Sequence, residues 1–190
     1  KKWRATTQSQ HRFPVAANTL DRAFTVEAPN RVWAGDITYV WTMEGWLYLA
    51  VLLDLYSRRV VGWAMGQRLT VDLAERALTM ALANRAPMAG LLHHSDRGSQ
   101  YAATSYQRVL DGYGLIPSMS RKGNCWDNAC VESFFGTLKR ELVYHRRYAT
   151  REEATQDIFE YIEVFYNRQR RHSTLGYDSP AEHEARAAVA

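Results

Sequence analysis

Hydrophobic and polar residues follow two different patterns along this chain, and the change from one to the other separates strands from helices. Three β-like apolar runs come first, at residues 33–40, 46–55 and 58–65. A turn at 43–45 and a tight connection at 56–57 separate them. Closely spaced turns between apolar runs of strand length are typical of antiparallel neighbours. The pattern therefore predicts a meander of three strands.

Beyond residue 70 the apolar positions take helical spacing. Thr70 is a suitable cap and Pro87 lies just past the end of this first predicted helix. Short apolar runs at 91–94 and 116–119 predict the fourth and fifth strands, with a helix between them that opens at Thr104. The spacing that predicts the first helix is carried by Leu73, Ala74, Ala77, Leu78, Ala81 and Leu82.

Two more helices are predicted in the last third of the chain. The first runs from about 127 to 144 and carries one apolar stripe. The second opens at Thr150, which forms a capping box with Glu153. The inward positions predicted for this last helix are Ala154, Ile158, Ile162 and Phe165.

The predicted order is βββαβαβα plus a C-terminal helix, which indicates an α/β protein. A meander followed by alternating strands and helices gives a mixed five-stranded sheet with helices on both faces. We expect three segments along the chain. Residues 1–30 form an extended basic arm or linker, 31–165 form the core, and 166–190 form a basic tail continuing from the last helix.

Composition and charge narrow the class of protein. The chain has 190 residues, of which 46% are hydrophobic, and no apolar run approaches the roughly 18 residues that a membrane span needs. Lys and Arg number 24 against 20 acidic residues, and the basic residues are enriched in 1–31 and 168–172. Such segments either contact a polyanion such as DNA or are simply solvated arms.

The two cysteines bear on the redox environment of the protein, and the first residue bears on whether the chain is part of a longer product. Cys125 and Cys130 provide neither a disulfide framework nor the ligands of a zinc site, so we expect reduced thiols in a cytoplasmic protein. The chain begins at Lys1, without a nearby apolar signal core, so we expect it to begin inside a longer product.

Three acids lie in different predicted elements. Asp36 lies within the first strand, Asp96 directly follows the fourth, and Glu132 lies in the helix after residue 127. Asp36 is 60 positions before Asp96, and 35 residues separate Asp96 from Glu132. Sites in open sheets form beyond the ends of the strands, where three carboxylates from separate elements can converge. Such a set suits Mg²⁺, and two ions can activate a nucleophile and stabilise a leaving oxygen.

A lone acid in a strand is more often a turn, cap or surface residue. Asp36 is harder to explain in that way, because its apolar neighbours predict partial burial, and a buried carboxylate needs a partner or a metal. The other aspartates that we assign to turns, caps or the surface are Asp54, Asp72, Asp111, Asp127 and Asp157.

Several longer motifs surround these acids, and together they carry a family resemblance. The chain resembles the catalytic core of bacterial insertion-sequence transposases of the "IS three" family, whose second reading frame product is similar to retroviral integrase. The resemblance covers nearly the whole chain from about residue 30. The segments that carry it are 33–39, 53–63, 93–101, 118–129, 132–139, 166–167, 171–172 and 175–180.

The resemblance implies an RNase H-like fold and a catalytic triad of Asp36, Asp96 and Glu132. Members of the family carry a basic residue seven positions after the glutamate, and Lys139 fills that place. Seven residues are almost two helical turns, so Lys139 shares the face of Glu132 and could hold a phosphate. The alternative for Lys139 is an ordinary surface lysine.

The implied activity is Mg²⁺-dependent DNA cleavage and strand transfer during transposition, with two ions in the active complex and Mn²⁺ as a substitute. The implied partners are element ends and target DNA, in a multimer assembled on DNA in the cytoplasm, at the nucleoid. Members also carry an N-terminal helix-turn-helix segment that recognises the ends, and nothing in residues 1–30 resembles one. We therefore expect this chain to depend on an additional N-terminal part or a companion protein.

Further residues are candidates for DNA contact because they are basic, aromatic or amide side chains and lie near the predicted site or the C-terminus. Trp126 could stack on a base or belong to the core, and Asn128 could cap or support the site. His94 could orient a carboxylate or be a satisfied core histidine. The predicted DNA contacts are Arg121, Lys122, Asn124, Trp126, Asn128, Lys139, Arg168, Arg170, Arg171 and His172.

Two other functions remain open from the sequence. The chain could be an RNase H-like nuclease that hydrolyses DNA without joining strands, which the acid spacing alone does not exclude. It could also be a non-catalytic DNA-binding remnant of a transposase. The presence of all three acids together with Lys139 argues against decay.

Overall fold

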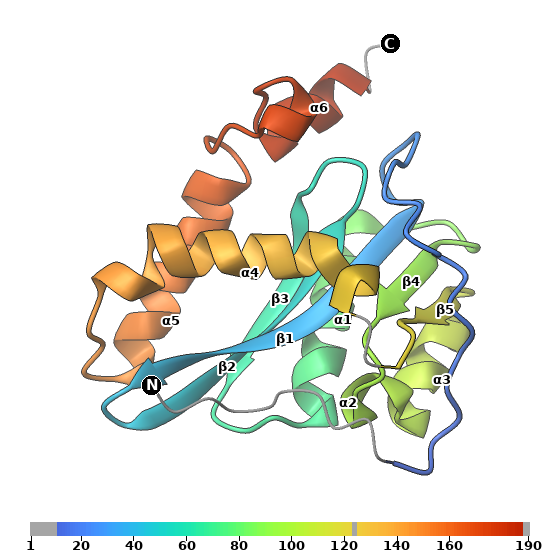
Figure 1. Ribbon diagram of the computed structural model, residues 1–190, viewed down its shortest axis with the longest axis horizontal. Coiled ribbons are helices and arrows are strands. Elements are labelled where there is room, and N and C mark those ends of the chain that lie inside the picture. The colour runs from blue at the N-terminus through green and yellow to red at the C-terminus, as the bar shows by residue number, and fades with distance from the viewer. Residues whose placement is uncertain (1–10, 123–124, 188–190) are drawn as a thin grey trace.

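The computed structural model describes residues 11–122 and 125–187. Its centre is one five-stranded sheet of order β3-β2-β1-β4-β5 (Figure 1). β1, β2 and β3 pair antiparallel, whereas β1, β4 and β5 pair parallel. The mixed sheet predicted from the sequence is therefore confirmed. The strands are β1 (Val32–Thr42), β2 (Gly45–Asp54), β3 (Val60–Gly66), β4 (Leu92–Ser95) and β5 (Ile116–Met119).

Strand β1 lies at the middle of the sheet because both of its faces are apolar. Trp33 and Ile37 enter one hydrophobic core, whereas Ala34 and Val40 enter the other. Successive side chains of a strand point to opposite faces, so this alternation fits a strand covered on both sides. It also places Asp36 on the same face as Ala34 and Val40.

Helices cover both faces of the sheet, as predicted (Figure 1). The core that contains Trp33 is covered by α1, α2 and α3, and the other core by α4 and α5. The short helices α2 and α6 were not predicted. The helices are α1 (Val71–Arg85), α2 (Ser99–Ala102), α3 (Thr104–Gly112), α4 (Ala129–Glu141), α5 (Arg151–Glu160) and α6 (Pro180–Ala187).

The last predicted helix changes from α-helical to π-helical hydrogen bonding at the end of α5. The α-helix passes directly into a π-helix, η3 (Tyr161–Tyr166), in which Asn167 N–H donates to the Ile162 carbonyl, five residues back. A π-turn holds more residues than an α-turn, so the buried face rotates. Tyr166 is buried, and Phe165 is 40% exposed. The prediction that Phe165 points inward is therefore wrong.

The C-terminal segment is folded against the sheet. The helix ends in a turn after Tyr166, and a short 3-10 helix, η4 (Ser173–Leu175), precedes α6. The Asn167 side chain accepts from Val60 N–H at 2.9 Å and donates to the Val60 carbonyl at 3.0 Å. Glu184 of α6 accepts from Arg59 and Arg85. These contacts hold the segment on the edge strand β3.

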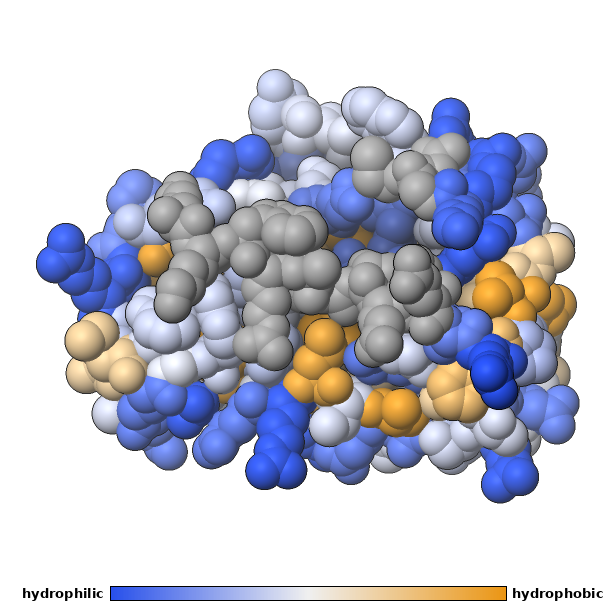
Figure 2. Space-filling view, turned by 60° about the horizontal axis from the view of Figure 1, so that its bottom comes forward, coloured by the Kyte–Doolittle hydropathy of each residue, from blue (hydrophilic) through white to orange (hydrophobic). Residues whose placement is uncertain are grey.

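The described part of the N-terminal arm, residues 11–31, contains neither helix nor strand. It passes along β4 and β5 (Figure 1), where Ser118 Oγ accepts the backbone N–H groups of Thr19 and Leu20. The face shown in Figure 2 carries separate hydrophobic patches set among strongly hydrophilic residues. Within the described ranges, no helix has the length and apolar character to cross a membrane.

Candidate active site

The pairing of β1 with β4 brings two of the predicted acids to the same place. Gly35 of β1 lies in parallel register with Ser95, the last residue of β4. Asp36 and Asp96 each directly follow one residue of this pair, so they lie side by side. Glu132 lies in the first turn of α4, which packs across β1 and β2. Three separate elements thus direct their acids to one end of the β1–β4 pair.

The charges of the three acids interact. The pKa of Asp36 is raised well above its usual value, mainly by burial and then by the negative charges of Asp96 and Glu132. The backbone N–H of Ile37 and the Lys139 ammonium act in the opposite direction. Burial also raises the pKa of Glu132, although its side chain is largely exposed. The site therefore disfavours the simultaneous ionisation of its carboxylates when no cation is present.

The donor atoms at this position are carboxylate oxygens, which are the preferred ligands of hard divalent cations. Among the described residues, however, no three His, Cys, Asp or Glu side chains are close enough together to hold one ion. The chemistry of the three acids therefore fits a divalent metal, and their side chains would have to draw together to share one.

The backbone around Asp96 fixes the direction of its carboxylate. Gly98 N–H donates to Asp96 Oδ1 at 2.8 Å, in the turn that leads into α2. A Cβ atom at position 98 would lie 2.9 Å from the same oxygen, which is closer than real Cβ contacts. Glycine at 98 therefore allows the backbone to hold this carboxylate.

Lys139 lies two turns along α4 from Glu132 and beside the first strand. Its Nζ atom is 5.0 Å from the centroid of the Tyr39 ring, on β1. Burial lowers the pKa of Lys139, and the charge of Asp36 raises it. The lysine is thus partly enclosed next to the acids, in the position from which it could hold a phosphate.

Sequence reasoning missed a buried tyrosine behind the acids. Tyr101 of α2 lies in the core, and its pKa is raised by burial, by Tyr106 and by the charges of Asp36 and Asp96. A side chain at Gly35 would lie 3.6 Å from the Tyr101 hydroxyl. The undetected helix α2 carries this residue, and its four residues are too few to give a periodic signal.

His94 is a core histidine. Its two ring nitrogens lie 2.9 Å from Ser118 Oγ and 3.1 Å from Ser120 Oγ, and the ring is fully buried. Burial lowers its pKa to about 4, so it is neutral at pH 7. Of the two alternatives for His94, the structure favours the satisfied core residue.

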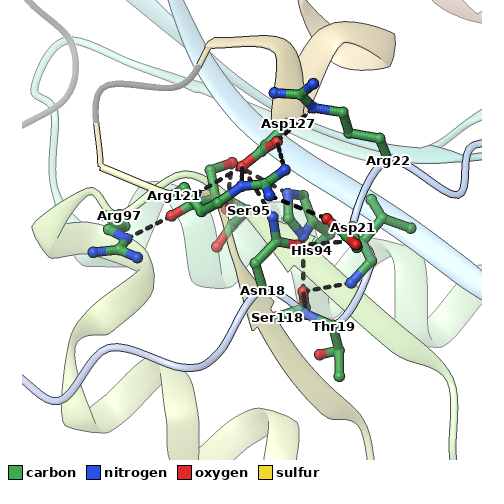
Figure 3. Close-up of polar contacts among 12 residues, drawn as sticks. Asn18, Thr19, Asp21, Arg22, His94, Ser95, Arg97, Ser118, Arg121 and Asp127 are labelled. Carbon is green, nitrogen blue, oxygen red and sulfur yellow. Dashed lines mark hydrogen bonds and ion pairs between the residues drawn. The ribbon is translucent and has the colours of Figure 1, made fainter.

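Asp127 organises the segment that leads into α4 (Figure 3). Its buried carboxylate accepts from Arg121 at 2.9 and 2.8 Å, from Arg22 at 2.9 Å and from Asn18 at 2.9 Å. These bonds hold the pKa of Asp127 far below its usual range. The prediction that Asp127 is a cap or surface residue is wrong, because it joins the N-terminal arm to the loop after β5.

The predicted DNA contacts around this loop have different surroundings. Lys122 is exposed, and Trp126 is 67% exposed, so the core alternative for Trp126 is wrong. Asn128 is buried and donates to the Gly35 carbonyl at 3.3 Å, which places it in the wall behind Asp36. Asn124 lies outside the described residues.

The C-terminal basic residues lie near α4. Arg170 forms a salt bridge of 2.7 Å with Glu141, and Arg171 donates to the Tyr177 carbonyl. Arg168 is exposed, and burial lowers the pKa of His172 to about 4. A cavity of about 550 Å³ separates this segment from the N-terminal half of α4. The segment therefore faces the helix that carries Glu132.

Comparison with protein families gives one consistent result. The integrase core domain family matches residues 26–125, and a second family with the same description, integrase core domain, matches residues 132–187. The two matched ranges contain Asp36, Asp96 and Glu132.

Curated relatives come from bacterial insertion sequences. The "Insertion element IS600 uncharacterized 31 kDa protein" of Shigella sonnei is 58% identical over 181 residues, which are 95% of this chain and 66% of that protein. "Transposase InsF for insertion sequence IS3A" of Escherichia coli K12 is 48% identical over 184 residues, 97% of this chain and 64% of that protein. The chain thus spans just under two thirds of the length of these relatives.

Solved structures show the same fold. The integrase catalytic core domain of HTLV-2 in complex with magnesium aligns with a TM-score of 0.63 at 16% identity, covering 83% of this chain and 97% of that one. A simian T-cell lymphotropic virus intasome chain aligns with a TM-score of 0.70 at 19% identity, over 94% of this chain and 61% of that one. This likeness confirms the RNase H-like fold.

Proposed function

Because this chain belongs to the integrase core domain family, which it shares with transposases of bacterial insertion sequences, we propose that it is a transposase catalytic core. It cuts DNA at the ends of an insertion sequence and joins the freed 3′ ends to target DNA. The observation that carries this proposal is the meeting of Asp36, Asp96 and Glu132 at one end of the β1–β4 pair, where their charges interact.

The proposed reaction needs a compensating charge beside these acids. Two Mg²⁺ ions held by the three carboxylates, with Mn²⁺ as a substitute, would supply electrostatic stabilisation of the attacking and leaving oxygens. Asp96 is aimed by the Gly98 N–H, and Asp36 is supported from behind by the Asn128 contact with Gly35. These contacts restrict Asp96 and the backbone beside Asp36, so that the remaining rearrangement is the approach of the carboxylates to a shared ion.

Lys139 has a separate role in this proposal. Its backbone position lies about 10 Å along α4 from that of Glu132, at 1.5 Å per residue. A cation at that distance would hold a phosphate next to the one under attack, and so align the strand. The same position beside Asp36 argues against an ordinary surface lysine.

The chain spans just under two thirds of the length of these relatives. We propose that recognition of the element ends lies in the remaining third or in a companion protein. We also propose that the active form is a multimer on DNA in the bacterial cytoplasm, because two ends must be brought together before joining.

The test is a strand-transfer assay with a DNA end carrying a 3′-OH and a supercoiled plasmid, in Mg²⁺ or Mn²⁺. We expect joined products from the wild type and none from Asp96→Asn. Asp72→Asn is the matched control, because Asp72 is an exposed acid on α1 that pairs with the exposed Arg76. Thermal unfolding of all three proteins checks that the fold is retained.

Each result has a clear meaning for the proposal. Joining by Asp96→Asn at the wild-type rate would refute the role of the three acids. Metal-dependent nicking without joining, even when upstream sequence from a longer relative is supplied, would favour the nuclease alternative. A wild type that binds DNA but performs no metal-dependent reaction in that longer form would favour the non-catalytic remnant.

A further inference from the structure

A second concave site lies at the far end of α4 from Glu132. It is a cavity of about 680 Å³ between the β1–β2 hairpin and the segment that follows α4. Tyr39, Trp41, Met43 and Trp46 contribute from the hairpin, and Tyr144 contributes from the other side. We call this the hairpin pocket.

Aromatic side chains form the walls of the hairpin pocket, and several are exposed. Trp41 is 54% exposed and Tyr144 is 61% exposed. Trp46 packs edge-on against both Tyr39 and Trp41, with 4.8 Å between ring centroids in each pair. Edge-to-face packing fixes the orientation of rings. The pocket therefore presents preformed aromatic surfaces to solvent.

The charge of the hairpin pocket is positive. Its lining residues include Lys139, Arg146 and Arg147 and contain no acid. Arg146 also pairs with Asp157 at 3.3 Å. Arg147 is exposed and makes no ion pair with any described residue. Aromatic faces bordered by cations suit a ligand with flat rings and negative charge.

Lys139 links the hairpin pocket to the proposed active site, because it lines the pocket and its charge interacts with that of Asp36. Tyr39 follows Asp36 by three residues on β1, about 10 Å at the usual rise of a strand. Lys139 belongs to both sites, about 10 Å along α4 from Glu132. A DNA strand advances about 3.4 Å per base step in a duplex, so the pocket begins about three steps from the acids.

We propose that the hairpin pocket binds a nucleotide base that is unstacked from the DNA strand leaving the active site. The inference rests on the proposed function and adds a binding site for the substrate. Trp41 and Tyr144 stack on the base, while Lys139, Arg146 and Arg147 contact its flanking phosphates. Base–aromatic stacking has little sequence preference, because every base has a flat face. The pocket therefore holds the strand by shape and charge rather than by reading its sequence.

The experiment measures binding of a duplex with a single-stranded 3′ extension, without divalent metal, so that catalysis plays no part. Fluorescence anisotropy gives the affinity, and an abasic position is moved along the extension. Loss of the base that occupies the pocket should weaken wild-type binding about tenfold, a typical value for one stacked base. Trp41→Ala and Tyr144→Ala should bind more weakly and should lose this dependence on the abasic position. Trp41→Phe should retain it.

Tyr113→Ala is the matched control, since Tyr113 is an exposed aromatic residue at the end of α3. It should behave as the wild type does. Equal abasic effects in the wild type and both alanine variants would overturn the pocket while leaving the proposed function intact. A change in oligomeric state by sedimentation, with the abasic effect unaltered, would show a protein interface instead and would also overturn it. Absence of DNA binding by the wild type and every variant would overturn the pocket, whereas the proposed function is tested separately by the strand-transfer assay.

Discussion

The Asn167 side chain is one attachment of the C-terminal segment to the central sheet, and its replacement tests that attachment directly. The side chain is buried, and its amide bonds both backbone groups of Val60 on the edge strand β3. The backbone carbonyl of Asn167 accepts from Ala181 N–H at 2.9 Å. Asn167→Ala would leave the N–H and the carbonyl of Val60 without these partners.

The expected loss follows from the two bonds. A buried backbone group left without a partner costs about 1–3 kcal/mol, so two such groups cost about 3 kcal/mol after some relaxation. For a chain of this length each kcal/mol lowers the melting temperature by roughly 2–4 °C, which predicts a fall of about 9 °C. Asn167→Asp should be at least as damaging, because it presents a carboxylate oxygen to the Val60 carbonyl.

Urea unfolding followed by circular dichroism measures the free energy of unfolding, and a thermal scan measures the melting temperature. Asn84→Ala is the control, since Asn84 is exposed and its bond to the neighbouring Val61 carbonyl is 3.5 Å long. We expect a change within about 0.5 kcal/mol for that variant. Asn167→Ala with an equally small change, or Asn167→Asp with wild-type stability at pH 7, would refute the reasoning.

Replacing either of two other acids should change the stability of the fold, in opposite directions. Asp127→Asn should lower the free energy of unfolding at pH 7, because the folded-state pKa of Asp127 is depressed by Arg121 and Arg22. That stabilisation is present above the unfolded-state pKa of about 3.9 and is lost as the pH falls below this value. The difference in free energy of unfolding between the wild type and Asp127→Asn should therefore become smaller in acid. A difference that does not change with pH would contradict this prediction. Asp36→Asn should raise the melting temperature at pH 7 without divalent cations, because burial and two neighbouring carboxylates disfavour the charged form of Asp36. An unchanged or lower melting temperature would show that this carboxylate is not under electrostatic strain.

Much of the fold was predictable because its signals are local. The strands and most helices have a clear period, and both faces of β1 are apolar. The positions of Asp36 and Asp96 followed from where their strands run and end. The turn or cap role predicted for Asp54 is also seen, because its carboxylate accepts from the backbone N–H groups of Asn30 and Tyr56.

The features that the sequence did not predict depend on contacts between distant residues or on small changes of winding. Asp127 is buried by Arg22 and Asn18, which lie more than a hundred positions away in the sequence. Asn167 bonds Val60 across 107 positions. The π-helix that turns Phe165 outward has the same apolar spacing in the sequence as an α-helix would have. No local pattern carries this information.

The position of β1 between an antiparallel and a parallel neighbour also determines when the site can exist. Its pairing with β2 needs only the tight turn between Thr42 and Gly45, and hairpins form in about 1–10 μs. Its pairing with β4 joins residues 60 positions apart, a closure that is slower because more chain must be ordered first. Glu132 comes still later in the chain. During synthesis on the ribosome, the growing polypeptide therefore has a folded hairpin long before its three acids can meet, and we expect the proposed activity to appear only when folding is nearly complete.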